Sequence, residues 1–566
     1  MSLFLLVPLV LVLPGYGWIL LWGLNKRFGV IDSLGLSFTI SVAFVSLITG
    51  GLSLLTTHYL SYSIDSSLGL SLIFLLVSLA RHRAPFHPVI RPRFDRYMLL
   101  LGGTLCAYAA MLGLLSWSAP FYPTADAVDP VSHIQIVQAI GNGSAKALML
   151  HANYAIGMHF VSAVLGSMLD IDALSAIRLL LILTLADLIF LTYFCARSLL
   201  KSAQAASFTV LASAFVIPVD AIHFIKIGTF PNILSDAIVI AMVWLTFSYT
   251  REPQRSLGLT LTLLAVAGLF VHSSFLIFLV ALWAALPVIF VCQRSYVRNY
   301  LEGIVFATAG IFLLLCLLGA FVAGHFDRIF TAYIISSLSP TPVLLIFQTL
   351  VWNYSVFAGS LTGLLIAGGI AFILLRQRSA IGPVFLCVWF GLMMAGAVVS
   401  TQGWRFVLLS LVPASFILGN LIESLRGLRG EMNWSRGFRL LMPVLLAAMI
   451  LSGSFVGLLP RVFDPSNRVR QEAIVDSMSW LKQNDLNQSV ASVGLWADYR
   501  YLEALTGIPY VGDFENVNLT LVGSRDKGFR FVAVAIQGPQ LSAFESSVVV
   551  QEKYRNGIVA IFFILS

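Results

Sequence analysis

The chain has 566 residues, of which 58% are hydrophobic and 11% are charged, and its mean hydropathy is +0.91. These values lie outside the range of soluble globular domains and exclude them for most of the length. The formal net charge of +8 could suggest a nucleic-acid partner. Much of the excess, however, lies in short loops between apolar runs, where membrane topology and anionic lipid explain it. We therefore expect a membrane protein with no nucleic-acid partner.

Apolar runs of about 20 residues, long enough to cross ~30 Å of hydrocarbon as helices, recur before residue 460. The first run is followed rather than preceded by Lys26 and Arg27, so we expect a spanning helix there instead of a secretory signal. We predict about fourteen transmembrane helices, which begin near residues 3, 33, 66, 97, 174, 205, 230, 257, 274, 302, 349, 382, 404 and 438. The five cysteines fall inside these helices and lack the spacing of a zinc site or a disulfide framework.

Arginine and lysine residues between the runs predict the orientation, because positively charged loops stay on the cytoplasmic side. All the basic connections fall on one side if the segment from about 151 to 168 lies in the membrane interface instead of crossing. These connections are residues 26–29, 80–96, 250–256, 293–300, 376–379 and 426–439. The extracytoplasmic side then receives the loops near 119–173, 219–230, 324–348 and 400–404, together with everything after about residue 460.

The composition changes after Pro460, where charged residues of both signs become frequent and no 18-residue apolar run occurs. The pattern predicts helices at 470–484 and 498–507, buried strands at 489–495 and 530–536, and a tight hairpin turn at Asn556 and Gly557. Alternating strands and helices favour a small α/β domain. We expect this domain to be water-soluble and extracytoplasmic.

The first outer loop carries two carboxylates and a histidine in the stretch DAVDPVSHIQIVQAI, residues 126–140. If Pro130 starts a helix, Asp129 is its cap and His133 lies on the same face one turn later. Two interpretations follow: Asp129 serves only as a helix cap, or Asp126 and Asp129 take a proton from an incoming hydroxyl or hold a divalent cation. The two roles are compatible, and the sequence leaves both open.

Two further outer segments carry charged candidates. Asp220, His223 and Lys226 lie in the second loop, where Lys226 is one of few cations that could balance a phosphate; a lysine reaching for the interface is the alternative. Arg405 follows Trp404 at the outer start of a predicted helix, where it breaks the charge bias of the rest of the chain, which makes it a functional candidate; a simple interfacial anchor is the alternative. No pattern typical of a serine or cysteine nucleophile occurs, so the sequence gives no support for covalent catalysis.

Several of these stretches resemble the GT-C glycosyltransferases in the order in which they occur. DPVSHIQIVQAI (129–140) and the following YAIGMHF (154–160) resemble the first outer loop of that family. GTFPNILSDAIVIA (228–241), GLFVHSSFLIF (268–278) and GWRFVLLSLVPASFILG (403–419) follow in the family's order, and residues 477–513 are similar to the soluble tail of the oligosaccharyltransferase catalytic subunit. The resemblance covers roughly residues 97–566.

The resemblance implies three parts: extra N-terminal transmembrane helices at 1–96, a GT-C-like transmembrane catalytic domain at 97–459 with its first large outer loop at 119–173, and a soluble extracytoplasmic α/β domain at 460–566. It implies an enzyme that passes a sugar, a hexose or a pentose, from a polyprenyl phosphate (dolichyl or undecaprenyl) to a glycan, lipid or protein acceptor on the outer face.

The resemblance also implies roles for single residues. Asp129 or Asp126 would be the catalytic base or a ligand of Mg²⁺ or Mn²⁺, and Arg405, with Lys226, would bind the donor phosphate. The other residues expected to line the site are His133, His159, Asp220, His223, Trp404 and Asp498. The chain departs from the oligosaccharyltransferases at LWADYRY (495–501), where they carry Trp-Trp-Asp-Tyr-Gly. They also carry a glutamate in a late outer loop, whereas residues 324–404 of this chain contain no glutamate. A single-sugar transferase is therefore favoured over peptide N-glycosylation.

Two other classes of function stay open. A polytopic transporter or flippase of lipid-linked or small substrates would place charged groups at mid-membrane, and Asp187 is the one obvious acid in such a position. A non-catalytic membrane scaffold would use the tail to bind a partner and the loop acids only to cap helices. Substitution of Asp129 or Arg405 separates these classes from a transferase, because a scaffold would tolerate both changes.

Overall fold

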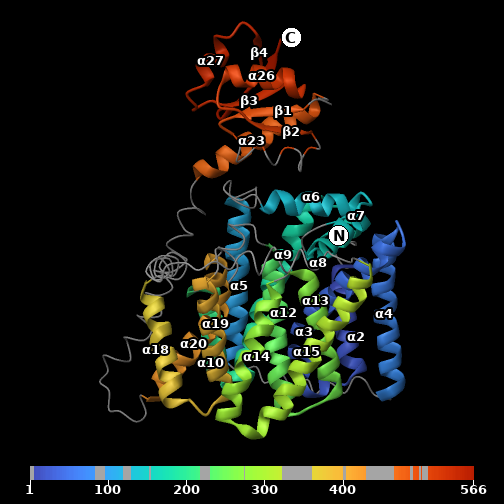
Figure 1. The fold of residues 1–566 in the computed structure, drawn as a ribbon, viewed down its shortest axis with the longest axis vertical. Coiled ribbons are helices and arrows are strands. Elements are labelled where there is room, and N and C mark those ends of the chain that lie inside the picture. The colour runs from blue at the N-terminus through green and yellow to red at the C-terminus, as the bar shows by residue number, and fades with distance from the viewer. Residues whose placement is uncertain are drawn as a thin grey trace. The chain divides into compact units, whose positions relative to one another are not determined.

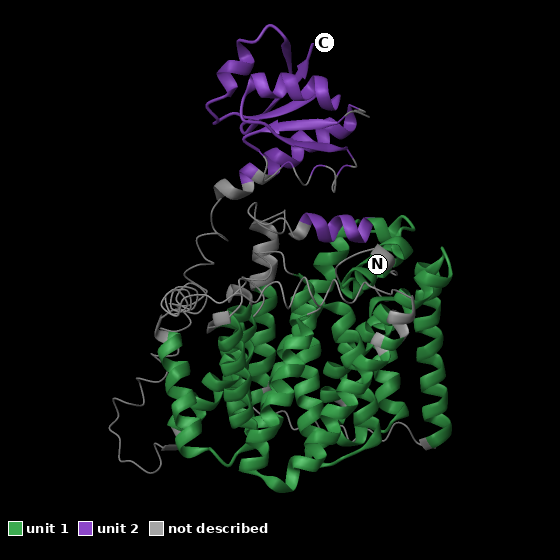
Figure 2. Cartoon of the chain, viewed as in Figure 1, with its two compact units in different colours: residues 1–110, 139–224, 230–457 green, residues 111–138, 225–229, 458–566 purple. Residues whose placement is uncertain are grey.

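The computed structural model describes residues 6–82, 96–118, 129–151, 155–216, 230–272, 274–321, 360–399, 403–428, 465–484, 489–495, 499, 502, 506 and 508–565. The chain divides into two compact units (Figures 1 and 2). The first consists of residues 1–110, 139–224 and 230–457, and the second of residues 111–138, 225–229 and 458–566. The boundaries predicted at residues 96 and 460 stay predictions.

The transmembrane part is built from helices. Their bounds are α1 Leu6–Leu11, α2 Leu13–Leu21, α3 Asn25–Leu55, α4 Tyr59–His82, α5 Arg96–Ser118, α6 Asp129–Gly141, α7 Ala145–His151, α8 Gly157–Leu169, α9 Ala173–Leu200, α10 Ala203–Leu211, the π-helix η2 Ala212–Val216, α12 Phe230–Arg251, α13 Arg255–Val271, α14 Phe275–Cys292, α15 Arg294–Phe321, α18 Ser360–Arg376, α19 Ile381–Val399 and α20 Gly403–Leu428. In Figure 1, α12, α13, α14 and α15 run side by side.

Within the described residues, 6 helices are long and apolar enough to cross a membrane, and several shorter apolar helices accompany them. The six spans are Ile31–Leu55, Tyr59–Arg81, Ala173–Leu200, Phe230–Arg251, Phe275–Cys292 and Phe406–Leu425. A multi-pass membrane protein is therefore confirmed, but the predicted count of fourteen spans is not. The run expected near residue 438 lies outside the described residues, and the run expected near 349 is described only from Ser360.

The helix α12 is the buried centre of the first unit. Its whole spanning window is enclosed by protein, and it packs against α9, α13 and α15. By contrast, α4 is only 22% buried over its window and exposes Leu72, Ile73 and Leu76, as expected for a helix that faces lipid. Position in the bundle, more than hydropathy, thus separates the helices that contact protein from those that contact lipid.

Small residues let neighbouring helices approach closely, as is common in membrane bundles. Gly419 of α20 lies against α10, where a Cβ atom would come 2.1 Å from Thr209 Oγ1.

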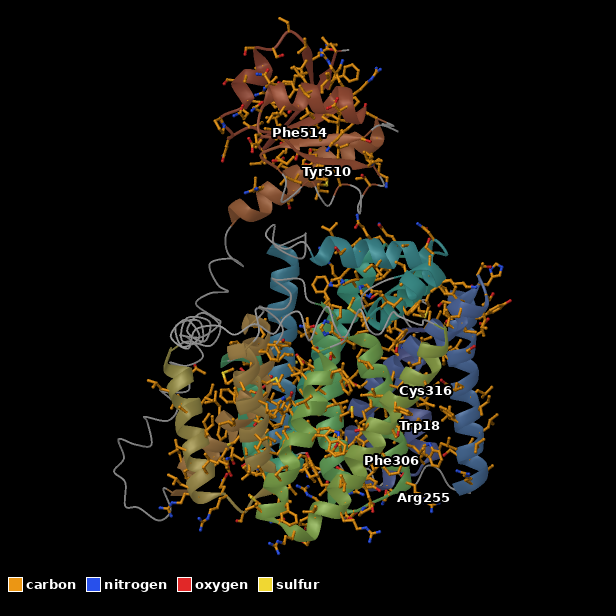
Figure 3. The ribbon with its side chains drawn as sticks, in the orientation of Figure 1. Trp18, Arg255, Phe306, Cys316, Tyr510 and Phe514 are labelled. Atoms are coloured by element: carbon orange, nitrogen blue, oxygen red, sulfur yellow. The ribbon has the colours of Figure 1, made fainter. Side chains whose placement is uncertain are left out.

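Polar contacts also join helices. One joins α3 to α9, because Thr39 Oγ1 donates to Asp187 Oδ2 over 2.6 Å and both side chains are buried. Another joins α2 to α13, where Trp18, labelled in Figure 3, donates from Nε1 to Thr260 Oγ1 over 3.0 Å. The acid that the sequence places at mid-membrane, Asp187, therefore links α3 to α9.

The segment expected to lie in the interface forms α8, which differs from that expectation in its surroundings. At 13 residues it is too short to cross the bilayer at ~1.5 Å per residue. Almost all its side chains are buried, however, against α3, α4, α9 and α13. An interfacial helix needs one face in contact with lipid headgroups, whereas α8 is enclosed by other helices.

The C-terminal part of the second unit is an α/β domain, as predicted. Its elements are α23 Pro465–Gln483, β1 Val490–Val493, β2 Tyr510–Asp513, α26 Val517–Lys527, β3 Phe531–Ala535, α27 Leu541–Glu545, β4 Val550–Arg555 and β5 Val559–Ile564. The strands form one sheet in the order β2-β1-β3-β5-β4. The strand β1 is parallel to β2 and β3, whereas β3–β5 and β5–β4 are antiparallel.

The predicted hairpin is confirmed between β4 and β5. Asn556 Oδ1 accepts hydrogen bonds from the amides of Ile558 and Val559, at 2.9 and 2.8 Å, which fixes the turn locally. The predicted helix at 470–484 and strands at 489–495 and 530–536 correspond to α23, β1 and β3. Most of the expected helix at 498–507 lies outside the described residues. The sequence pattern missed β2, α26 and α27.

Candidate functional site

The helix α6 begins at Asp129, one residue before the predicted start at Pro130. Asp129 therefore lies in the first turn, where a carboxylate is favoured by the partial positive charge of the helix N-terminus. His133 follows one turn later on the same face, and its side chain is buried, with 4% exposed. The side chain of Asp129 and the whole of Asp126 lie outside the described residues, so their roles as base or metal ligands stay predictions.

The helix α20 begins at Gly403, which confirms that Arg405 stands at a helix start. The backbone of this start is held by α19. A Cβ atom on Gly396 of α19 would come 2.2 Å from the ring of Phe406, so the residue after Arg405 packs directly on the neighbouring helix. Such packing gives the Arg405 backbone a fixed position. The side chains of Trp404 and Arg405 are outside the described residues.

The remaining predicted site residues divide by whether the structure describes them. His159 lies in α8 and is fully buried. Asp220, His223, Lys226 and Asp498 lie outside the described residues. His133 and His159 belong to different compact units. The structure therefore gives no geometry that brings the predicted catalytic and phosphate-binding residues together.

Among the described residues, no group of three or more histidine, cysteine, aspartate or glutamate side chains could hold a metal ion. The side chains of the two predicted ligands, Asp126 and Asp129, lie outside the described residues. Carboxylate oxygens are the ligands that Mg²⁺ and Mn²⁺ prefer, so the donor chemistry of this pair fits either ion. The cation stays a prediction.

Sequence reasoning missed two buried polar residues near the start of α12. Asn232 and Asp236 are each 3% exposed and stand four residues apart, on one face of the helix. This end of α12 follows the predicted second outer loop. A spacing of four between polar residues in an otherwise apolar helix is a signal that the sequence contains. An acid so placed in a membrane helix is a candidate site residue.

Asp172, in the first outer loop, is described in full and has a structural role. It caps α9, accepting from the Ser175 amide over 3.0 Å and from the Ser175 hydroxyl over 2.5 Å. Burial raises the pKa of the Asp172 carboxyl, but the hydrogen bonds from Ser175 and neighbouring amides lower it more, so the pKa lies below its usual value. This carboxyl is therefore held ionised as a cap, and we do not assign it to catalysis.

His272 also has a local structural role. It follows the last residue of α13, and its Nδ1 accepts from the amide of Ser274 over 3.1 Å, with the Ser274 hydroxyl 2.6 Å away. Because Nδ1 accepts a hydrogen bond from an amide, the neutral ring carries its own proton on Nε2. The side chain is 6% exposed.

No protein-family model matches the sequence, and no curated protein matches it. Solved structures do resemble it. ArnT from Cupriavidus metallidurans bound to undecaprenyl phosphate is 12% identical with a TM-score of 0.56, over 82% of this chain and 97% of that one. The same protein in the apo state gives a TM-score of 0.51 at 12% identity, over 81% and 98% of the two chains.

The oligosaccharyltransferase of Archaeoglobus fulgidus in its apo form is 11% identical with a TM-score of 0.52, over 79% of this chain and 70% of that one. At such identities the likeness concerns the fold. Both solved proteins are GT-C glycosyltransferases, which confirms the resemblance found in the sequence. This chain has the fold of the GT-C glycosyltransferases.

Proposed function

We propose that this protein is a glycosyltransferase that moves a sugar from a polyprenyl-phosphate donor to an acceptor on the extracytoplasmic face. The observation that carries the proposal is the likeness to ArnT with undecaprenyl phosphate bound, which extends over 97% of that chain. The likeness therefore extends over nearly the whole of a protein whose structure was solved with a polyprenyl phosphate bound, and this supports a donor of the same class.

The reaction assigns each predicted residue a chemical role. The acceptor hydroxyl loses its proton to Asp129 or Asp126, its oxygen bonds to the anomeric carbon, and the bond from that carbon to the phosphate oxygen breaks, with inversion. Polyprenyl phosphate leaves with additional negative charge. A guanidinium fixed at the start of α20, supplied by Arg405, stabilises that charge more in the transition state than in the ground state. Lys226 would add a second cation to the donor phosphate.

The distribution of basic residues between the helices supports an orientation of the chain in the membrane. The basic connections gather at the ends of helices opposite to the starts of α12 and α20, and positively charged loops stay cytoplasmic. The starts of α12 and α20 then face outward. The α/β domain after residue 460 would also be extracytoplasmic, where it could contact the acceptor.

The test follows sugar transfer by the full chain reconstituted in lipid, with a panel of labelled hexosyl and pentosyl polyprenyl phosphates and cell-envelope extracts as acceptors. Both glycosylated acceptor and released polyprenyl phosphate are measured. We expect Asp129→Asn to lower the rate by about 10²–10⁴-fold, the usual contribution of a general base. Arg405→Ala should lose about as much, because removal of one transition-state charge partner typically costs about 10²–10³-fold.

Matched controls separate catalysis from folding. Asp170→Asn makes the same chemical change in the same outer loop, at an exposed residue whose backbone φ of 53° asparagine also adopts. Arg298→Ala removes an arginine that is exposed and pairs only locally with Glu302. Both should transfer sugar at the wild-type rate. Unchanged transfer in Asp129→Asn and Arg405→Ala would move the site elsewhere, and no turnover with any donor would favour a transporter or a scaffold.

A divalent cation, if Asp126 and Asp129 bind one, would hold the donor phosphate or polarise the acceptor. Treatment with EDTA should then abolish transfer, and Mg²⁺ or Mn²⁺ should restore it in the wild type. Asp126→Asn should raise the cation concentration needed for half-maximal activity, because one anionic ligand is lost. Full activity in EDTA would leave Asp129 as a base alone.

A further inference from the structure

A cavity of about 200 Å³ opens at the end of the bundle opposite to the start of α20. It lies where α9 and α12 end, and where α19 begins. It is small compared with the ~300–1,000 Å³ of clefts that bury whole drug-sized ligands, so it has room for a single charged group. The polar residues that line it are Lys201, Thr250, Arg251, Gln293, Tyr296, Gln377 and Asn420.

The lining of this cavity is cationic. Lys201 and Arg251 contribute two positive charges, and no acidic side chain is among the lining residues. In the part of the chain that the structure describes, neither cation takes part in a salt bridge, whereas Arg27 and Arg298 at this end pair with Glu252 and Glu302 at 3.4 and 3.0 Å. The positive charge of the cavity is therefore left for a ligand.

The positions of both cations are set by the backbone. Arg251 donates to the hydroxyl of Ser198 over 3.1 Å and to the carbonyl oxygen of the same residue, which joins the end of α12 to the last turn of α9. Lys201 follows α9 with φ 55°, a left-handed conformation that is unfavourable for a lysine. Glycine or asparagine would adopt it more readily, so the presence of a lysine there is a cost that a ligand contact would offset.

A helix start and neutral polar side chains also line the cavity. The helix α19 starts at Ile381, and its first residues line the cavity, so the partial positive charge of the helix N-terminus adds to the two cations. Asn420 Nδ2 donates to Gln377 Oε1 over 2.7 Å, and Gln293 Nε2 donates to the carbonyl of Ser379 over 2.9 Å. These bonds hold the polar rim of the cavity in one arrangement.

We infer that this cavity binds a phosphate group, either in the headgroup of an anionic lipid or as a soluble phosphate. The charge of the surrounding loops places the cavity on the cytoplasmic side, where anionic lipid headgroups and soluble phosphates are both at hand. The bound group bridges α9, α12 and α19. The site is separate from the donor-phosphate site proposed at Arg405, and its occupation does not depend on sugar transfer.

The experiment measures thermal unfolding of the full chain in nanodiscs. One arm compares phosphatidylcholine alone with phosphatidylcholine that contains about one fifth phosphatidylglycerol. The other titrates inorganic phosphate into the phosphatidylcholine discs, against sodium chloride at equal ionic strength. Binding to the folded state raises the unfolding midpoint. A rise with phosphatidylglycerol only assigns a lipid headgroup, and a rise with phosphate assigns a soluble ligand.

Lys201→Asn tests the site without strain, because asparagine accepts the left-handed backbone at this position. It should weaken the response by on the order of tenfold in apparent affinity, the effect of one charge-assisted contact. Lys201→Arg should respond as the wild type. Lys26→Asn is the matched control, since Lys26 is an exposed lysine at the same end of the bundle and does not line the cavity. An equal response of Lys201→Asn and wild type, or no response of the wild type to either probe, would overturn the inference.

Discussion

Single residues at helix starts carry much of the chemistry proposed for this chain. Asp129 opens α6, Asp172 caps α9 and Arg405 stands in the first turn of α20. Two of these residues are acids, which the partial positive charge of a helix N-terminus favours. The positive charge of the arginine is repelled by that same partial charge. An arginine in an unfavourable place needs a compensating anion, which agrees with a phosphate as its partner.

Substitution of Asp172 measures how much the α9 cap contributes to the free energy of unfolding. Asp172→Ala should lower the free energy of unfolding by about 0.5–2 kcal/mol, the usual loss when a capping side chain is removed. Asp172→Asn keeps an accepting oxygen and should lose less. Thermal unfolding in detergent at pH 7 measures both, with Asp170→Asn as the control from the same loop. Equal stability of Asp172→Ala and wild type would show that the cap contributes nothing.

The same carboxyl predicts a pH dependence. Its pKa is lower in the folded than in the unfolded protein, so its contribution is complete above the unfolded value of about 3.9 and is lost as the pH falls through the lower folded value. The difference in unfolding midpoint between wild type and Asp172→Ala should stay constant from pH 7 to 5. It should shrink below about pH 4. A difference that is unchanged at pH 3 would contradict this assignment.

At the scale of elements, close helix contacts are the feature most open to test. Gly419→Val places atoms where Thr209 and the backbone of α10 already lie. Overpacking of this kind typically costs about 1–3 kcal/mol, and here it would separate α20 from α10. Gly368→Val on the neighbouring α18 is the control, because a Cβ atom there meets nothing within 4 Å. The unfolding midpoint of Gly419→Val should fall and that of Gly368→Val should not.

The elements also show what the sequence could predict. Long apolar runs and the Asn556-Gly557 turn were predicted because hydropathy and turn chemistry are local properties. The strand β2 was missed because YVGD is only four residues long, half-buried and contains a glycine, so it has no alternating pattern. The burial of α8 was also missed, since it depends on four other helices. Asn232 and Asp236 were passed over because their burial follows from the central position of α12.

At the scale of the whole molecule, the sheet domain has a core of its own. Val532, Val534 and Phe562 are buried among residues of the same domain, and Phe544 packs on Phe562 with ring centroids 5.4 Å apart. About 100 residues with such a core are enough for independent folding. Residues 465–566, expressed alone, should therefore unfold in one cooperative transition.

Substitutions in that domain give the prediction a magnitude. Phe562→Ala should lower the free energy of unfolding by about 3–5 kcal/mol, the usual cost of removing a buried phenylalanine. Val522→Ala is the control, since Val522 is 56% exposed on α26. Urea unfolding followed by circular dichroism measures both. A gradual, non-cooperative loss of signal from the isolated domain would show that its core needs the rest of the chain.

The central position of α12 has a consequence for the insertion of this helix into the membrane during synthesis. This helix is the least hydropathic of the six long spans, yet it is the one that is wholly enclosed in the finished bundle. During synthesis it must partition from the translocation machinery into lipid before all its neighbours have been made, since α13 and α15 follow it in the chain. The free-energy cost of exposing its polar residues to lipid therefore arises at insertion, because no partner helix covers them at that stage. Substitutions that add polarity to α12 would therefore raise the cost of insertion and reduce the amount of protein made.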